Sequence, residues 1–329
     1  MSDAAVRNIT YAQAIRTALR EEMKRDESVV LWGEDIGVYG GVYGATTGLQ
    51  REFGKDRVRD AAISEMAIAG MAVGAAMLGL RPVVEIMYED FLMHASDAIA
   101  NQAAKWRYMT NGQFKVPLVV RSPGGGGSGY GAQHSQNIEA WFAHVPGLKV
   151  IAAGLPRDAR GLLKAAIRDD NPVLFLEHKG HYTYKGDVPR EEEVLPIGVA
   201  DVKCTGTDVT LVSWSKTIVF ALEAAERLAA EGTSVEVIDP LTLLPLDMDT
   251  IANSVAKTHR LVVATESHTV CGVSAEIAAQ VCERCFGDLK APPKRLGSRF
   301  VPLPYSEPLE SYVIPDADDI AEAVRSVMG

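Results

Sequence analysis

The feature that most constrains the fold is a regular alternation of short, continuously apolar runs with longer segments of helical periodicity. The apolar runs contain no alternating polar positions, which is typical of parallel strands that helices cover on both faces. Strands are expected at 29–32, 83–87, 116–121, 148–152, 173–177, 209–212, 235–238 and 261–264. Helices are expected at 11–24, 65–78, 91–108, 157–168, 219–231, 248–257 and 274–286. The pattern therefore predicts an α/β fold.

The alternation is interrupted between residues 181 and 198, where glycine, prolines and consecutive glutamates replace it. Such a composition is typical of an interdomain linker. A chain of 329 residues is long enough for two domains, and the pattern resumes after the interruption. We therefore expect domains at 1–190 and 191–329.

The charge balance bears on the classes of partner. Acidic residues number 43 against 33 basic ones, giving a formal charge of −10. This balance argues against nucleic acid, while it suits a basic protein partner. No apolar run reaches the ~18 uncharged residues that a membrane span needs. The first residues carry no apolar signal core, and we therefore expect a cytoplasmic protein.

Glu65 is the only charged residue between Asp60 and Arg81. The segment that follows it is apolar or small at every position, which predicts a helix buried on every face, within this subunit or against another. At the first turn of such a helix, the helix N-terminus favours the ionised carboxylate and desolvation favours the protonated one. These residues alone leave open a helix-capping glutamate exposed to solvent.

A glycine-rich stretch follows the expected strand 116–121. It contains Gly124-x-Gly126-x-x-Gly129, the spacing of a dinucleotide fingerprint, but no long apolar helix opens behind it. We therefore interpret the stretch as a loop, and loops carry functional residues. His134 ends the loop and is suited to donate or accept a proton near neutral pH. A loop histidine without a role remains the alternative.

Two acids, Glu34 and Asp35, come directly after the first expected strand. The carboxyl ends of parallel strands are where α/β sheets place their sites. The acids are therefore candidates for a site, with a solvated turn as the alternative.

Several motifs in the correct order make the chain resemble, over nearly its full length, the β subunit of the thiamine-diphosphate-dependent 2-oxo acid dehydrogenase E1 component. That family includes pyruvate, branched-chain 2-oxo acid and acetoin dehydrogenases. The matching segments are 33–37 (GEDIG), 63–66 (ISEM), 79–82 (GLRP), 132–136 (AQHSQ), 146–150 (PGLKV) and 239–242 (DPLT). The resemblance implies a transketolase-like pyrimidine-binding domain with a parallel sheet, followed by a C-terminal transketolase-type α/β domain.

The resemblance also implies roles for individual residues. Glu65 would hydrogen-bond N1′ of the aminopyrimidine and so promote loss of the thiazolium C2 proton. His134 would assist reductive acylation of the lipoyl group. Glu34 would belong to a tunnel linking paired active sites. The side chains that would contact the pyrimidine are those of Ile63, Met87 and Phe91.

A diphosphate and magnesium motif that begins Gly-Asp-Gly is absent from this sequence. By resemblance it belongs to an E1 α subunit, so the expected assembly is a heterotetramer of two α and two β subunits that share thiamine diphosphate, with Mg²⁺ held mainly by the α subunit. The expected reaction is decarboxylation of a small, pyruvate-like 2-oxo acid and reductive acylation of lipoyl-E2, whose basic subunit-binding domain would dock on the acidic C-terminal domain. A potassium site is expected by position at Val116, Leu118, Val119, Ala166, Asp169 and Asn171, mostly through backbone carbonyls.

The chain departs from the family pattern at Ala62, at Glu89 and Asp90 beside Phe91, and at His94. These departures motivate an alternative, a thiamine enzyme of the same family that acts on acetoin or performs carboligation or acyl transfer without E2. A non-catalytic scaffold and a nicotinamide dehydrogenase are two further alternatives.

Overall fold

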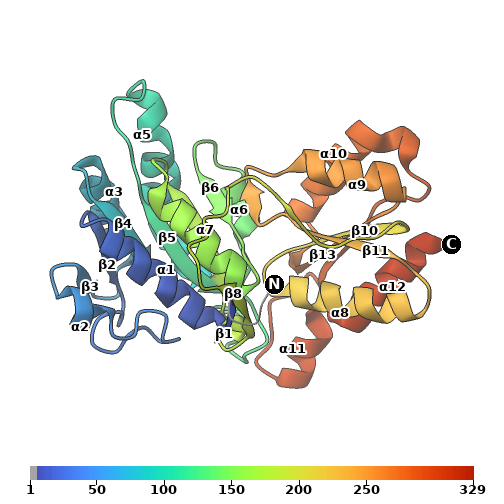
Figure 1. Ribbon diagram of the computed structural model, residues 1–329, viewed down its shortest axis with the longest axis horizontal. Coiled ribbons are helices and arrows are strands. Elements are labelled where there is room, and N and C mark those ends of the chain that lie inside the picture. The colour runs from blue at the N-terminus through green and yellow to red at the C-terminus, as the bar shows by residue number, and fades with distance from the viewer. Residues whose placement is uncertain (1–5) are drawn as a thin grey trace. The chain divides into compact units, whose positions relative to one another are not determined.

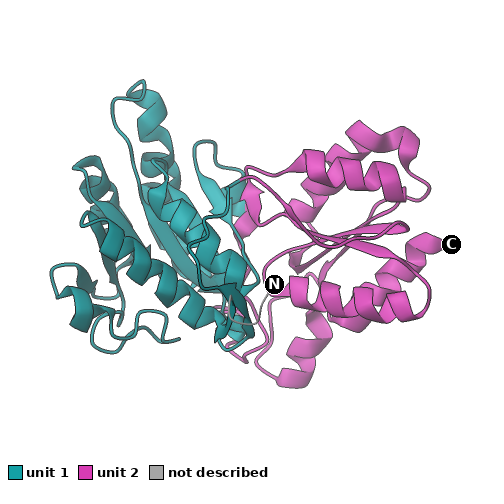
Figure 2. Cartoon of the chain, in the orientation of Figure 1, with its two compact units in different colours: residues 1–124, 141–197 teal, residues 125–140, 198–329 magenta. Residues whose placement is uncertain are grey.

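The computed structural model describes residues 6–329 and divides into two compact units (Figure 2). Unit 1 comprises Met1–Gly124 and Trp141–Ile197, and unit 2 comprises Gly125–Ala140 and Gly198–Gly329. The predicted domain boundaries, 1–190 and 191–329, remain a prediction. In the structure, the glycine-rich segment 125–140 belongs to the same compact unit as residues 198–329.

Unit 1 is built on a parallel sheet, as the continuously apolar runs predict (Figure 1). Its strands are β2 (Val29–Gly33), β3 (Val58–Asp60), β4 (Arg81–Glu85), β5 (Val119–Gly124), β6 (Lys149–Ile151) and β7 (Val173–His178). They lie in the order β6-β7-β5-β4-β2-β3, and each neighbouring pair is parallel. The loops after β2, β4, β5 and β7 therefore meet at one edge of the sheet.

The four helices predicted in the N-terminal half, at 11–24, 65–78, 91–108 and 157–168, are confirmed, and three further short helices were not predicted. The helical elements are α1 (Tyr11–Arg25), α2 (Leu49–Phe53), α3 (Glu65–Met77), η2 (Glu89–Phe91), α4 (Leu92–Ser96), η3 (Asp97–Ala103), α5 (Ala104–Met109), α6 (Glu139–Ala143), α7 (Pro156–Arg168) and η4 (Lys179–His181). The predicted helix 91–108 is the continuous run η2–α4–η3–α5, in which η3 is π-helical. Helix α1 begins at a capping box in which Thr10 and Gln13 each accept the other's backbone N–H, as predicted.

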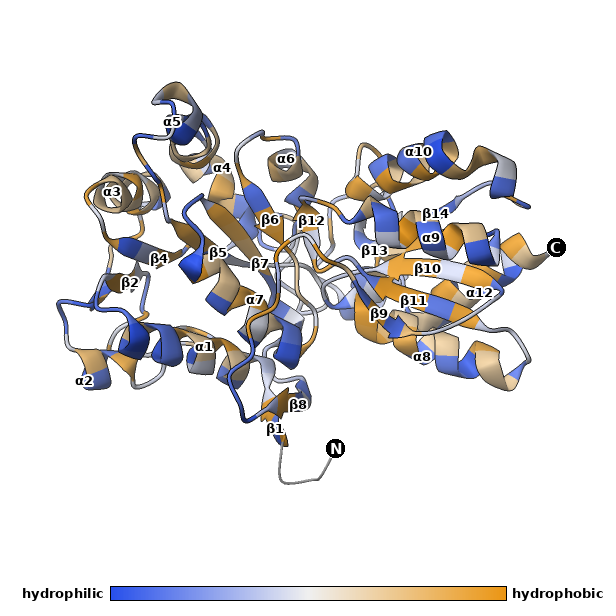
Figure 3. Cartoon of the chain, turned by 45° about the horizontal axis from the view of Figure 1, so that its top comes forward, coloured by the Kyte–Doolittle hydropathy of each residue, from blue (hydrophilic) through white to orange (hydrophobic). Residues whose placement is uncertain are grey.

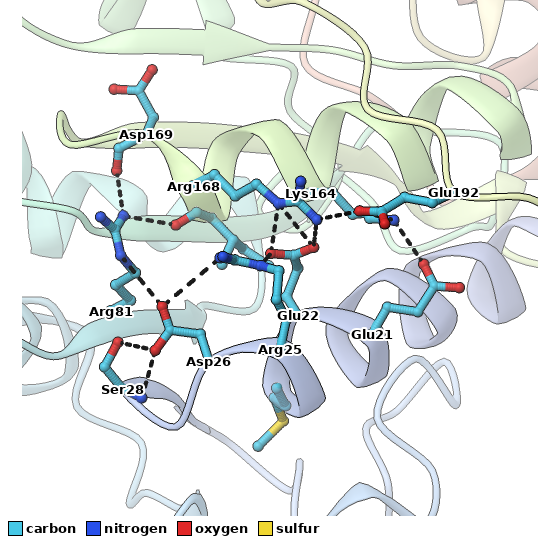
Figure 4. Close-up of polar contacts among 12 residues, drawn as sticks. Glu21, Glu22, Arg25, Asp26, Ser28, Arg81, Lys164, Arg168, Asp169 and Glu192 are labelled. Atoms are coloured by element: carbon cyan, nitrogen blue, oxygen red, sulfur yellow. Dashed lines mark hydrogen bonds and ion pairs between the residues drawn. The ribbon is translucent and has the colours of Figure 1, made fainter.

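Helices α1 and α7 pack against each other and are joined by ion pairs (Figure 4). Glu22 of α1 is fully buried and accepts hydrogen bonds from Arg168 at 2.7 Å and Arg25 at 2.8 Å. The neighbouring Glu21 accepts from Lys164 at 3.0 Å. Because a buried carboxylate is costly without such partners, this network holds the two helices in register.

The interpretation of 181–198 as a linker is wrong for part of that segment. Strand β8 (Lys185–Pro189) pairs antiparallel with β1 (Val6–Thr10), and both belong to unit 1. The pair forms a sheet of its own. Pro189 is the last residue of β8, where a missing N–H costs little, and the linker-like composition therefore hides a short strand.

Unit 2 is a second α/β layer structure. Its central sheet has the order β14-β13-β10-β11-β9, in which β9 runs antiparallel to β11 and the other pairs are parallel. The bounds of its strands are β9 (Asp201–Cys204), β10 (Val209–Ser213), β11 (Val235–Asp239), β12 (Thr242–Leu244), β13 (Leu261–His268) and β14 (Lys294–Ser298). Figure 3 shows β10 and β11 as largely hydrophobic strands, which matches their full burial.

Helices α8 and α12 pack together in unit 2, and so do α9 and α10, with one pair on each face of the sheet (Figure 1). The bounds are α8 (Thr217–Ala230), α9 (Met248–Thr258), α10 (Val273–Cys285), η5 (Phe286–Asp288), α11 (Glu307–Val313) and α12 (Ala317–Met328). The apolar periodicity does not predict β9, β14, α11 or α12. Within residues 6–329, every helix is too short or too polar to cross a lipid bilayer.

Candidate functional site

Glu65 is the first residue of α3 and is only 8% exposed. The solvent-exposed helix cap, which the sequence left open, is therefore not what the structure shows. Ser64, the residue before it, makes no side-chain cap to the helix. The Glu65 carboxylate thus lies at the positive end of a helix while being withdrawn from water.

The expectation that α3 is buried on every face is wrong for the chain by itself. Ile68, Ala69 and Ala72 are buried, whereas Met66 is 66% and Met71 57% exposed. The sequence could not assign a buried face because apolar and small residues occupy all sides of the helix. Exposed methionines on a regular helix are typical of a surface that another chain covers.

A cavity of about 440 Å³ lies beside this exposed face. Side chains of β2, of the segment after β3 and of α3 line it, among them Trp32, Ala62, Ile68, Met71 and Leu80. Ala62, one of the departures from the family pattern, therefore lines this apolar space, whereas Glu65 is not among its lining residues.

Glu34 lies close to Glu65, at the carboxyl end of β2. It is 8% exposed, and its Oε1 atom has no hydrogen-bond partner among the described residues. Burial raises the pKa of the Glu34 carboxyl to about 7, and the charge of Glu65 is the next largest cause. Asp35, by contrast, is exposed. Of the two acids after the first strand, only Glu34 is a buried, partly protonated group near neutral pH.

His94 of α4 joins this group. Its Nδ1 atom lies 3.4 Å from Oε2 of Glu65, and its ring centroid is 5.9 Å from that of Phe91. Of the remaining predicted lining residues, Ile63 is 81% exposed and Met87 is half-buried after β4. The structure thus gathers Glu34, Glu65, His94 and Phe91 at one edge of the unit 1 sheet.

The other departures from the family pattern, Glu89 and Asp90, are buried in η2. A Cβ atom on Gly124 would lie 2.2 Å from Cδ of Glu89. A side chain at the end of β5 would therefore displace the buried Glu89 side chain.

Sequence reasoning missed a buried charge cluster beneath this edge. Arg121 of β5 is 2% exposed and donates to both carboxylate oxygens of Glu177 on β7, at 2.6 and 2.8 Å. It also donates to Glu85 of β4 at 2.6 Å. Burial raises the pKa of Glu85 although Arg121 opposes this effect. Charged residues at the ends of adjacent apolar strands were the signal that could have found the cluster.

His134 belongs to unit 2, whereas Glu65 belongs to unit 1, and each is described within its own unit. His134 is half-buried, and its N–H donates to the carbonyl of Gly131 at 3.3 Å. No helix begins in the glycine-rich loop, as predicted. Its amides at Gly126, Gly127 and Gly129 are already bonded to glutamate side chains, so they are not available to cradle a phosphate.

The residues expected to bind potassium are close together, at the start of β5 and the end of α7. The N–H of Val116 donates to the carbonyl of Asp170 at 3.2 Å. The carbonyl of Asp169 accepts from Arg81 at 2.9 Å (Figure 4), and the Asp169 carboxylate pairs with Lys149. Among residues 6–329, no group of three or more His, Cys, Asp or Glu side chains could hold a metal ion, and a site of backbone carbonyls remains a prediction.

Family models match both halves of the chain. Residues 7–185 match the pyrimidine-binding domain of transketolase. Residues 198–320 match the C-terminal domain of transketolase. A solved structure described as a split-gene transketolase in an inactive beta4 tetramer has the same fold, with a TM-score of 0.80 over 97% of this chain and 98% of that one, at 23% identity.

Curated relatives are similar over nearly the full length. The 2-oxoisovalerate dehydrogenase subunit beta of Bacillus subtilis is 45% identical over 97% of this chain and 98% of its own. A mitochondrial pyruvate dehydrogenase E1 component subunit beta of Oryza sativa is 48% identical, covering 98% of this chain and 87% of its own. The corresponding subunit of Rickettsia felis is 46% identical over 97% and 98%, respectively. None of these names indicates acetoin cleavage or carboligation, so the alternative activity is not favoured.

Proposed function

Because the chain belongs to the family of β subunits of 2-oxo acid dehydrogenase E1 components, we propose that it forms half of a thiamine-dependent active site that decarboxylates a small, pyruvate-like 2-oxo acid and reductively acylates lipoyl-E2. The observation that carries the proposal is the buried pair formed by Glu34, after β2, and Glu65, at the start of α3. One member of the pair has a polar atom without a hydrogen-bond partner among the described residues. Buried polar groups in this condition are typical of sites completed by a ligand.

The residues present fit thiamine diphosphate. When bound, this cofactor supplies an electron sink for the carbanion left by decarboxylation. Glu65 would hold a proton at N1′ of the aminopyrimidine, because its carboxylate is withdrawn from water at a helix N-terminus. Phe91, Met87 and Ile63 would contact the pyrimidine ring. Glu34, with a pKa raised to about 7 by burial, can carry or release a proton near neutral pH beside Glu65.

His134 would act on the lipoyl group, where its imidazole is suited to deliver a proton to a sulfur atom during acyl transfer. Its half-buried position leaves the ring accessible to a partner.

The proposed assembly is a heterotetramer of two α and two β subunits. The exposed apolar face of α3 and the cavity beside it support burial against another chain. The E1 α subunit would hold most of the diphosphate and Mg²⁺ contacts. The E2 subunit-binding domain would dock on unit 2, a potassium ion would be bound by the carbonyls near β5 and α7, and the assembly would work in the cytoplasm.

Co-expression with the E1 α subunit of the same organism tests the proposal. We expect thiamine-diphosphate-dependent release of carbon dioxide from pyruvate or from a branched-chain 2-oxo acid, measured with an artificial electron acceptor. The ratio of the two rates identifies the preferred substrate. An assembled complex that binds the cofactor but decarboxylates no 2-oxo acid would refute the proposal.

Adding a lipoyl domain separates the main proposal from its alternative. Acyl transfer should require the lipoyl domain. Formation of acetoin or another carboligation product at the same rate without it would favour the alternative, to which Ala62, Glu89 and His94 first pointed.

A further inference from the structure

The glycine-rich loop 125–136 is held in place by acidic side chains. Glu310 of α11 accepts the N–H of Gly127 at 2.8 Å with one carboxylate oxygen and the N–H of Gly129 at 3.0 Å with the other. Glu266 at the end of β13 accepts the N–H of Gly126 at 2.6 Å. Both glutamates are buried, with exposures of 2% and 6%, respectively. Hydrogen bonds between N–H groups and a carboxylate are stronger than those between neutral groups.

The apolar surroundings of the loop reinforce these bonds. A Cβ atom on Gly126 would lie 2.6 Å from Cδ1 of Ile314, and one on Gly131 would lie 2.3 Å from Cζ of Tyr305. Gly131 also has a positive φ of 72°, which favours glycine. The loop backbone therefore lies directly on the segment that carries Glu310.

Two backbone hydrogen bonds within the loop hold the segment that contains His134. The N–H of Gly125 donates to the carbonyl of Gln136 at 3.1 Å, and the N–H of His134 donates to the carbonyl of Gly131 at 3.3 Å. A displacement of Gly127 or Gly129 is thereby transmitted to the histidine backbone. His134 lies five positions after Gly129 and seven after Gly127, and such a short segment has few dihedral angles with which to absorb a displacement.

We propose that Glu310, together with Glu266, is a positioning residue that fixes the loop so that His134 meets the lipoyl group. This inference rests on the proposed function for the role of His134. The hydrogen bonds of Glu310 and Glu266 to the loop amides, here called the carboxylate–amide clamp, do not depend on it. Neither glutamate touches a reacting atom. A small misplacement of a catalytic group is enough to slow a reaction by one or two orders of magnitude.

Glu310→Gln tests the clamp with little change in size. The amide oxygen of glutamine can accept one N–H, but its NH₂ group faces the other as a second donor. In the full chain, we expect hydrogen exchange at Gly127 and Gly129 to accelerate about tenfold or more. Glu307→Gln is the matched control, because Glu307 lies on the same helix and is exposed. Unchanged exchange in Glu310→Gln would overturn the clamp.

The functional arm uses the complex reconstituted with the α subunit. In Glu310→Gln, the ratio of lipoyl acylation to decarboxylation with an artificial acceptor should fall about tenfold, while Glu307→Gln keeps the wild-type ratio. A purely structural role would lower both rates together, and that result would overturn the positioning inference. If Glu310→Gln does not fold, Glu266→Gln takes its place in both measurements, with hydrogen exchange then followed at Gly126.

Failure of the proposed function and failure of the carboxylate–amide clamp give different results. A wild-type complex without decarboxylation would refute the proposed function and the lipoyl part of the inference. Faster amide exchange in Glu310→Gln would still establish the clamp under that outcome.

Discussion

Two regions of the molecule contain buried carboxylates, and the hydrogen-bond partners of these carboxylates differ between the regions. In unit 2, Glu266 and Glu310 are bonded to the amides of the glycine-rich loop. In unit 1, Glu34 keeps an oxygen without a hydrogen-bond partner among the described residues, beside the buried Glu65. A carboxylate bonded to backbone N–H groups belongs to the scaffold, whereas one without such partners is available to a ligand. Burial alone therefore does not identify a functional acid.

The cluster around Arg121 is an intermediate case, since a cation rather than the backbone satisfies Glu85 and Glu177. It lies in the same unit as the candidate site. Each kind of buried acid can therefore be tested by a substitution. The substitutions follow in order of the size of the effect expected.

Arg121→Met should produce the largest effect on stability. The substitution leaves the carboxylates of Glu85 and Glu177 buried without their cation, and we expect the free energy of unfolding to fall by about 3–5 kcal/mol. Urea unfolding of the full chain measures it. Arg51→Met, at an exposed arginine of α2, should change stability by no more than about 0.5 kcal/mol. Equal stabilities for the two variants would show that the cluster is not needed to satisfy the acids.

Glu65→Gln should act on activity rather than on folding. The amide retains the shape of the side chain but cannot exchange a proton with a ring nitrogen, so we expect decarboxylation by the reconstituted complex to fall about 100-fold or more. Glu226→Gln, at an exposed glutamate of α8, should leave the rate unchanged. Wild-type activity in Glu65→Gln would support the non-catalytic scaffold.

Glu34→Gln should change how the stability of the folded chain depends on pH. Burial raises the pKa of Glu34 to about 7 in the folded chain, so the folded state binds more protons than the unfolded state from about pH 4 to about pH 7. The contribution of Glu34 to stability is therefore lost as the pH rises through that range. We expect thermal unfolding of the wild type to weaken, relative to Glu34→Gln, by on the order of 1–2 kcal/mol between about pH 5 and about pH 8.

The direction of this change is the critical result. A wild type that gains stability over Glu34→Gln with rising pH would mean that the carboxylate is paired in the folded state, and the contrast between the two regions would disappear.

The apolar runs and helical periodicity were sufficient to predict the parallel sheets, because continuous burial of a strand leaves a strong signal. They were insufficient at β8, where terminal proline and glycine resemble a linker, and at α3, whose composition is apolar on all sides. The isolation of Glu65 among apolar residues predicted its burial as one of two possibilities, and the structure decided between a buried carboxylate and an exposed helix cap. The contact of Glu65 with His94 depends on how α3 and α4 pack, and periodicity does not specify such a contact.

The partners of the glycine-rich loop could not be predicted for a related reason. Glu266 and Glu310 lie more than a hundred residues beyond Gly126 in the sequence, at separations of 140 and, from Gly127, 183 positions. No local pattern connects acids to amides over such distances, and the positive φ values at Gly127 and Gly129 only indicate that glycine is needed there.

The loop 125–140 leaves the middle of one compact unit and packs into the other, which has a consequence for dissecting the protein. A gene fragment that begins at residue 198 would encode a sheet complete in its strands, yet it would lack the loop N–H groups that Glu266 and Glu310 accept in the full chain. The C-terminal half should therefore be expressed with residues 125–140 joined to it through a short artificial tether, or not separated at all.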